Sequence, residues 1–241
     1  MMEMIRSQRD PMNVMQRISD QLSEAYEVFS NQGPADLLLD VNTANNYLII
    51  SEDLKTATET DINQKRPESA ERFQDHPQVM SSNSFTSGRH YWDVEISESA
   101  IWMLGVCYPS IMRKEEEPPR RGEQSFLGCN KKSWCLGADT VDGSPGCSVI
   151  HDHDVLRFRY WISKNRFRVY VDYEAGQLSF FELGGHVRHL YTYNATFNEP
   201  VHAVFNIRDG WMKIAPVPSP STVTPMQEPP AEGRTRCCAL L

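Results

Sequence analysis

Apolar residues recur at every second position in short runs between Leu37 and Ile214, and this alternation constrains the fold more than any other feature. Trp92, Val94 and Ile96, for example, alternate with charged residues. Further strand candidates surround Leu156, Phe167, Leu178, Leu190, Val201 and Trp211, and the run from Ile101 to Cys107 is apolar on both faces, as in a central strand. Turn residues separate these runs and no helical periodicity interrupts them. The sequence therefore predicts an all-β chain that folds as an antiparallel β-sandwich.

The composition supports a folded domain and narrows its class. Of the 241 residues, 40% are hydrophobic and 10% are aromatic, which is enough to build a core. The net charge of −8 argues against a dedicated nucleic-acid binder. Basic and aromatic residues interleave at 157–161 and 166–170 as in an RNA-binding sheet, but half-buried strands give the same pattern. Weak RNA binding is kept as an alternative, and nucleic acid is not the expected partner.

Motifs of enzymes are missing from the sequence. It contains no Gly-x-Ser-x-Gly elbow, no phosphate-cradling glycine-rich loop and no His-Glu-x-x-His helix. The six cysteines fit no paired metal-ligand spacing and are interpreted as reduced thiols. The four histidines His151, His153, His186 and His189 are interpreted as loop residues. We therefore expect no catalysis, no cofactor and no metal.

Residues 1–33 are predicted to be helical. Asp10-Pro11 provides a helix start, and apolar residues then follow with heptad spacing at Met15, Ile18, Leu22, Ala25 and Phe29. Two heptads are too few for an isolated coiled coil. Two interpretations stay open: a helix that packs on the following domain, or the stump of a longer coiled coil through which the chain dimerises.

Residues 215–241 are predicted to be a disordered, proline-rich tail. Six of the 15 prolines lie between Pro216 and Pro230. The chain ends in Cys238-Ala-Leu-Leu, which matches the C-a-a-X pattern, and a final leucine favours geranylgeranyl. Cys237 either carries a second lipid or is a neighbour only. No signal-peptide-like or membrane-spanning run is present, so we expect a cytoplasmic protein that is membrane-associated through this lipid.

Two long polar stretches, Ala57 to Glu71 and Met112 to Gln124, are expected to be loops that carry a binding function. Exposed aromatic and arginine side chains are the usual energetic anchors of a protein interface. On that basis, the residues expected to bind a partner protein are Arg113, Trp134, Asp139, Tyr160 and Trp161. Trp134 fits a core position as well as a pocket position, and the sequence leaves this open.

Five blocks occur in an order that resembles the PRY-SPRY domain of the tripartite-motif and butyrophilin-like group. They are Leu39-Asp-Val-Asn-Thr-Ala44 with Glu71-Arg-Phe73, Phe85-Thr-Ser-Gly-Arg-His-Tyr-Trp92, Trp102-Met-Leu-Gly-Val106, Asp172-Tyr-Glu-Ala-Gly176 and Phe197-Asn-Glu-Pro-Val201. The resemblance covers about residues 37–214. Val41, where the family usually has proline, and the segment Met80-Ser-Ser82 depart from its pattern.

This resemblance implies a bent sandwich of the concanavalin-like jelly-roll type that binds other proteins through loops at one end. Such domains often end tripartite-motif ubiquitin ligases, after a coiled coil. No RING or B-box pattern precedes the domain here, so a ligase activity is not carried over to this chain alone. The alternative is that the chain acts as the substrate-recognition arm of such a ligase, with a role in innate immunity. Within the blocks, Trp92 and Trp102 are expected to be buried, and Gly88 and Gly176 to occupy turns.

Overall fold

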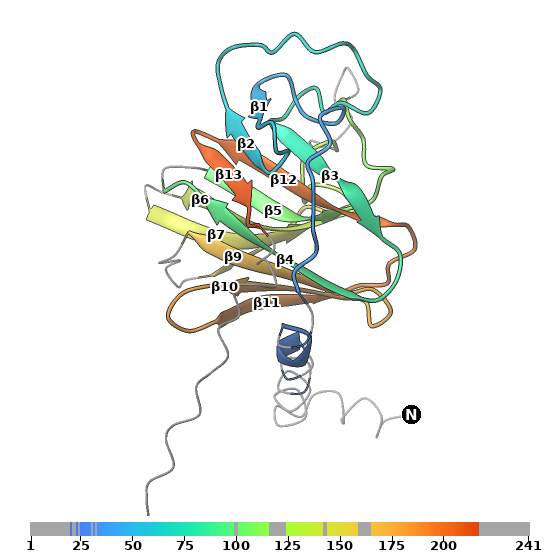
Figure 1. Ribbon diagram of the computed structural model, residues 1–241, viewed down its shortest axis with the longest axis vertical. Helices are drawn as coiled ribbons and strands as arrows, with labels where there is room; N and C mark the ends of the chain where they lie inside the picture. Colours follow the sequence, from blue (N-terminus) through green and yellow to red (C-terminus); the bar gives the residue numbers. More distant parts are fainter. Residues whose placement is uncertain are drawn as a thin grey trace, which may run out of the picture.

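The computed structural model describes residues 20, 23, 25–29, 31, 33–98, 101–115, 124–141, 144–158 and 165–216, and within these ranges it leaves out the side chains of 139–141, 144 and 145. The described chain forms two antiparallel sheets that face each other (Figure 1). The first sheet has the order β1 (Leu48–Ile50), β2 (Thr56–Glu59), β13 (Trp211–Ile214), β4 (Arg89–Ile96), β9 (Arg166–Asp172), β10 (Gln177–Glu182) and β11 (Arg188–Asn194). The second has the order β3 (Gln78–Phe85), β12 (Val201–Arg208), β5 (Ile101–Cys107), β6 (Ser133–Val141), β7 (Ser144–His151) and β8 (Asp154–Phe158). The expected antiparallel β-sandwich is therefore confirmed.

The main core lies between the sheets and is built from the residues that alternate in the sequence. Trp92 is completely buried and Trp102 is 5% exposed, as predicted. The ring of Trp102 lies against Phe167 of the opposite sheet, with 4.6 Å between the centroids. Large aromatic side chains that span a sheet-to-sheet interface bury much apolar area, so these residues stabilise the frame.

Two strands of the sandwich differ from the expectation. Ala57, expected at the start of a loop, is buried in β2, where the strand pairs with both β1 and β13. At the other extreme, Val155 and Leu156 of β8 are each 50% exposed, although the sequence predicts a half-buried strand there. β8 is the last strand of its sheet and pairs with β7 on one side only.

A helical segment that includes Ala25–Phe29 packs on the outer face of the first sheet, at the bottom of Figure 1. Ala25 and Val28 are buried there beside Tyr170 and Phe181. The ring of Phe29 has the guanidinium of Arg168 4.5 Å from its centroid. The described part of the N-terminal segment thus packs on the following domain, and Met15, Ile18 and Leu22 of the heptad pattern lie outside the described residues.

Arg168 is itself fixed by the sheet. Its Nε and Nη2 donate to the two carboxylate oxygens of Asp93 on β4, at 2.6 and 2.8 Å. The same guanidinium lies 4.3 Å from the ring centroid of Tyr91. A paired, stacked arginine has no free face for a phosphate, so Arg168 stabilises the sheet and the helical segment.

The β9–β10 hairpin depends on two glycines and two carboxylates. Gly88 and Gly176 both have positive φ, 79° and 67°. Asp172 Oδ1 accepts a hydrogen bond from the amide of Ala175 at 2.9 Å, and Glu174 accepts from the amide of Gly88 at 2.8 Å. The turn between the strands is therefore tied to the start of β4.

No helix within the described ranges is long and apolar enough to cross a membrane.

Replacing Gly176 by alanine tests this turn. An added Cβ at Gly176 would lie 1.7 Å from the carbonyl oxygen of Ala195, in a backbone conformation that alanine disfavours. We expect Gly176→Ala to lower the free energy of unfolding by at least ~1 kcal/mol, measured by chemical denaturation. Gly185→Ala is the matched control, because nothing lies within 4 Å of its added Cβ. Equal stabilities of the two variants would contradict the assignment.

Candidate functional site

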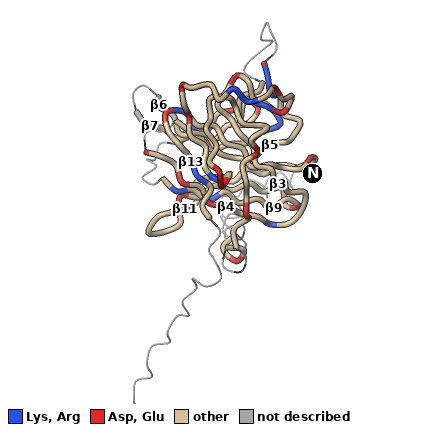
Figure 2. The backbone as a smooth tube through the Cα atoms, turned by 45° about the horizontal axis from the view of Figure 1, so that its top comes forward, with Lys and Arg blue, Asp and Glu red and all other residues tan. Residues whose placement is uncertain are grey.

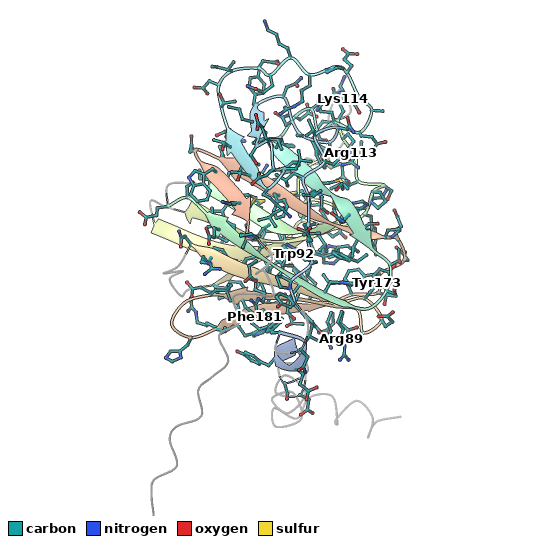
Figure 3. All side chains as sticks on the ribbon, viewed as in Figure 1. Arg89, Trp92, Arg113, Lys114, Tyr173 and Phe181 are labelled. Carbon is teal, nitrogen blue, oxygen red and sulfur yellow. The ribbon has the colours of Figure 1, made fainter. Side chains whose placement is uncertain are left out.

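Two polar loops meet at the end of the sandwich that lies opposite the helix, near the labels of Arg113 and Lys114 in Figure 3. One loop joins β2 to β3 and the other follows β5. The amide of Gln74 donates to the carbonyl of Arg113 at 2.8 Å, and the amide of Glu115 donates to Asp75 Oδ2 at 2.7 Å. The two loops that the sequence analysis considered separately therefore form one surface.

Arg113 fastens the two loops together. Its guanidinium lies 4.6 Å from the ring centroid of Phe73, and its Nη2 donates to the carbonyl of Pro109 at 3.0 Å. Glu71 lies 3.6 Å away as a salt-bridge partner. Only 10% of the Arg113 side chain is exposed, and burial lowers the pKa of its guanidinium. The structure thus places this predicted binding residue mainly beneath the surface, where it shapes the loops.

Apolar residues hold the second loop down on the outer face of the β3–β8 sheet. Ile111 is 3% exposed and Leu127 is completely buried. They form a second core cluster together with Phe73, Cys135 and Ile150. This cluster is separate from the core between the sheets, and it gives the loop surface its own support.

Asn45 organises the first loop. Its side chain is 3% exposed and donates to the carbonyls of Phe73 and Gln74, both at 3.0 Å. Its Oδ1 accepts from the amide of Tyr47 at 2.8 Å. The bonds fix the backbone that carries the ring of Tyr47, which is 46% exposed. A rigidly held, exposed aromatic ring is a frequent anchor of protein interfaces.

A hollow of about 410 Å³ lies beside Tyr47. Its charged lining residues are Arg72, Lys114 and Glu68, and Asn46, Asn63 and Gln74 add amide groups. Figure 2 shows basic and acidic residues intermingled over this end of the molecule. The hollow is open and polar, and its two cationic side chains outnumber its one carboxylate. Such a hollow can accept a polar group of a ligand.

Arg72 lines this hollow, and Arg66 lies close enough to Arg72 for their charges to interact. Arg66 donates to the carbonyls of Asn45 and Leu48 at 3.0 and 2.6 Å. Arg72 donates to the carbonyls of Val41 and Ala44 at 3.0 and 2.7 Å. Burial and the neighbouring charge of Arg72 lower the pKa of Arg66. The pair of like charges concentrates a positive potential close to the hollow.

Trp134, which the sequence left open between core and pocket, belongs to the core. It is 6% exposed and packs edge-on against Tyr108 and Phe197, with centroids 5.2 and 5.6 Å away. The ring of His151 stacks on it at 4.6 Å and bonds the carbonyl of Ser133 through Nδ1 at 2.8 Å. This histidine therefore has a packing role.

Most of the other predicted site residues cannot be placed in the surface. The backbone of Asp139 pairs with Gly146 across β6 and β7, but its side chain lies outside the described residues. Tyr160, Trp161, Cys237 and Cys238 also lie outside them. These residues stay predictions.

The described residues contain no group of three His, Cys, Asp or Glu side chains that could hold a metal ion. Cys107 is completely buried, and burial raises the pKa of its thiol to about 12. A thiol with such a pKa is protonated at neutral pH and unreactive.

Asn45, Tyr47 and Arg72 belong to the site but were not predicted from the sequence. Tyr47 lies in a short polar stretch that gives no strand or helix signal, and Asn45 acts through contacts with residues 28 and 29 positions away. Arg72 stood inside one of the family blocks, which pointed to a framework role. The polarity of the two stretches from Ala57 to Glu71 and from Met112 to Gln124 is the signal that points to this end of the molecule.

Comparisons with known proteins agree with this architecture. The PRY model, described as the SPRY-associated domain, matches residues 37–85, and the SPRY domain model matches 89–214. Mouse tripartite motif-containing protein 14 is 33% identical over 181 residues, which are 75% of this chain and 39% of that protein. Bovine E3 ubiquitin-protein ligase TRIM11 is 33% identical over 202 residues, 82% of this chain and 38% of that protein.

A solved structure supports the assignment of the fold. The crystal structure of the TRIM65 PSpry domain has a TM-score of 0.67 at 25% identity, and the match covers 79% of this chain and 95% of that one. The chain spans less than two fifths of the length of the two curated relatives. From residue 37 to residue 214, the chain therefore belongs to the PRY-SPRY family, whose domains are protein-interaction modules.

Proposed function

We propose that this chain is a non-catalytic recognition module that binds a partner protein through the surface around Tyr47 and Lys114. The observation that carries the proposal is the fixed arrangement of the two polar loops. Arg113, Asn45 and the Ile111 cluster hold them in place before any partner arrives. A preformed surface loses little conformational entropy on binding, so such loops suit specific recognition.

The chemistry of the surface supports a protein ligand. It combines a half-exposed tyrosine, several amide side chains and charges of both signs. Interfaces between proteins use this mixture, with an aromatic anchor inside a polar rim. The helical segment covers Tyr91, Tyr170 and Phe181 on the outer face of the first sheet, away from these loops, so it leaves the loop surface open.

Two alternatives concern the wider context. Some relatives are named E3 ubiquitin-protein ligases, and the chain matches 38% and 35% of the length of two of them. Action as the substrate-recognition arm of such a ligase is compatible with the same binding surface. Weak RNA binding is disfavoured, because Phe167 and Tyr170 are buried and Arg168 is paired with Asp93.

The tail suggests where the module acts. The C-a-a-X pattern at Cys238 favours geranylgeranylation and attachment of a cytoplasmic protein to a membrane. One lipid chain gives only marginal membrane binding, so stable attachment needs an acylated Cys237 or a membrane-bound partner. This tether is a separate proposal from the recognition surface.

Proximity labelling in cells tests the recognition surface. We expect the double variant Tyr47→Ala/Lys114→Ala to lose the proteins that wild type labels selectively, because it removes the exposed ring and the charge at the hollow. Glu52→Ala, an exposed residue outside the surface, is the control. Both variants should keep the melting temperature of wild type. An unchanged set of labelled proteins would place the binding surface elsewhere.

A second experiment tests the tether. Cys238→Ser should move a fluorescently tagged protein from membranes to the cytosol, because serine cannot form the thioether to the lipid. Mass spectrometry of the wild-type protein from eukaryotic cells should show a truncated, prenylated C-terminus. An intact Leu241 in that spectrum would remove the proposal, and Cys237→Ser distinguishes the contribution of the second cysteine.

A further inference from the structure

The hollow beside Tyr47 adjoins a second one of opposite charge. The second hollow has a volume of about 240 Å³ and is lined by the carboxylates Glu59, Asp61 and Asp75. The two hollows share Asn45, Tyr47 and Gln74, so they form one groove with Tyr47 between its halves. The half with Arg72 and Lys114, which Glu68 also lines, is the basic hollow, and the half with the three carboxylates is the acidic hollow.

The basic hollow contains a buried cation that lacks an anion. Arg72 is 6% exposed and donates to three backbone carbonyls, those of Val41, Ala44 and Pro67. Its Nε is buried and has no acceptor, and within the described ranges no carboxylate pairs with Arg72 or with Arg66. A buried charge is normally balanced by an opposite charge. Arg72 therefore favours a carboxylate or another anion in the adjoining space.

The acidic hollow is arranged to accept a cation. Asp75 accepts the amide of Glu115 and Glu59 accepts the amide of Asp209, which holds both carboxylates in place. Among the described residues, Asp61 has no hydrogen-bond or ion-pair partner. No cationic side chain lines this half of the groove. Its three charges are therefore available to a basic group.

We propose that this groove binds an extended segment of a partner protein that carries an acidic and a basic side chain. The acidic side chain lies in the basic hollow near Arg72 and Lys114, the basic side chain lies in the acidic hollow near Asp61, and the ring of Tyr47 contacts the segment between them. The inference rests on the proposed function and names the chemistry of the partner at the same surface.

A protein segment fits better than a small anion for two reasons. A small anion would satisfy Arg72 but would leave the acidic hollow empty. A peptide chain presents both charges at once and also provides backbone groups for Asn46, Asn63 and Gln74. The opposed charges additionally fix the direction in which the segment lies, because a reversed segment would bring like charges together.

An arrayed library of random octapeptides tests the proposal on the full-length protein. Wild type should select peptides that combine Asp or Glu with Lys or Arg. Lys114→Glu should weaken the selection for the acidic side chain about tenfold, and Asp61→Lys should do the same for the basic one, since each reverses one charge of the groove. Lys131→Glu and Glu52→Lys are matched controls on exposed residues that line neither hollow, and they should select as wild type does.

Three results would overturn the inference: no selection of charged peptides, a selection that survives both charge reversals, or saturable binding of inorganic phosphate without peptide selection. The last would assign the basic hollow to a small anion. If cellular partners are lost in Tyr47→Ala/Lys114→Ala but are kept by both charge-reversal variants, the proposed function stands and this inference alone fails.

Discussion

The contact of Arg113 with Phe73 is the interaction on which the loop surface depends. It joins a residue that follows β5 to a residue that precedes β3, and it lies above the second core cluster of Ile111 and Leu127. The Arg113 side chain is only 10% exposed, so its guanidinium must keep its acceptors, because separating the loops would leave the charge without them. The contacts that stabilise the buried Arg113 therefore also hold the two loops together.

The two ends of the sandwich have different tasks. At one end, the helical segment covers Tyr91, Tyr170 and Phe181, and Arg168 links it to the sheet through Phe29. At the other end, polar loops lie over a small apolar cluster and present amides, charges and a tyrosine to solvent. Close packing of the buried side chains makes the β-sandwich rigid. A rigid sandwich allows the loops to keep one conformation without a bound partner.

The frame was predictable because it follows from local pattern. Trp92 alternates with charged residues, and Trp102 belongs to a run that is apolar on both faces, so both positions are expected inside a sheet. Trp134 also stands in an apolar run, but its burial depends on Tyr108 and Phe197, which are distant in sequence. Asn45 and Arg72 could not be assigned to the site because their partners are backbone carbonyls of other segments, and no pattern of side chains records such contacts. The short strand β2 was missed for a similar reason, since its pairing with β13 joins residues about 150 positions apart.

Amide hydrogen exchange at Gln74 and Glu115 tests the central claim most directly, which is that the two loops form one fixed surface in the free protein. Each of these amides donates a hydrogen bond across the junction of the loops. The account predicts that both exchange slowly in the absence of a partner, at rates that approach those of paired strand amides in β13, and that both lose protection together in Arg113→Met. Fast exchange of both amides in the wild-type protein would contradict it, because the surface would then form only on binding.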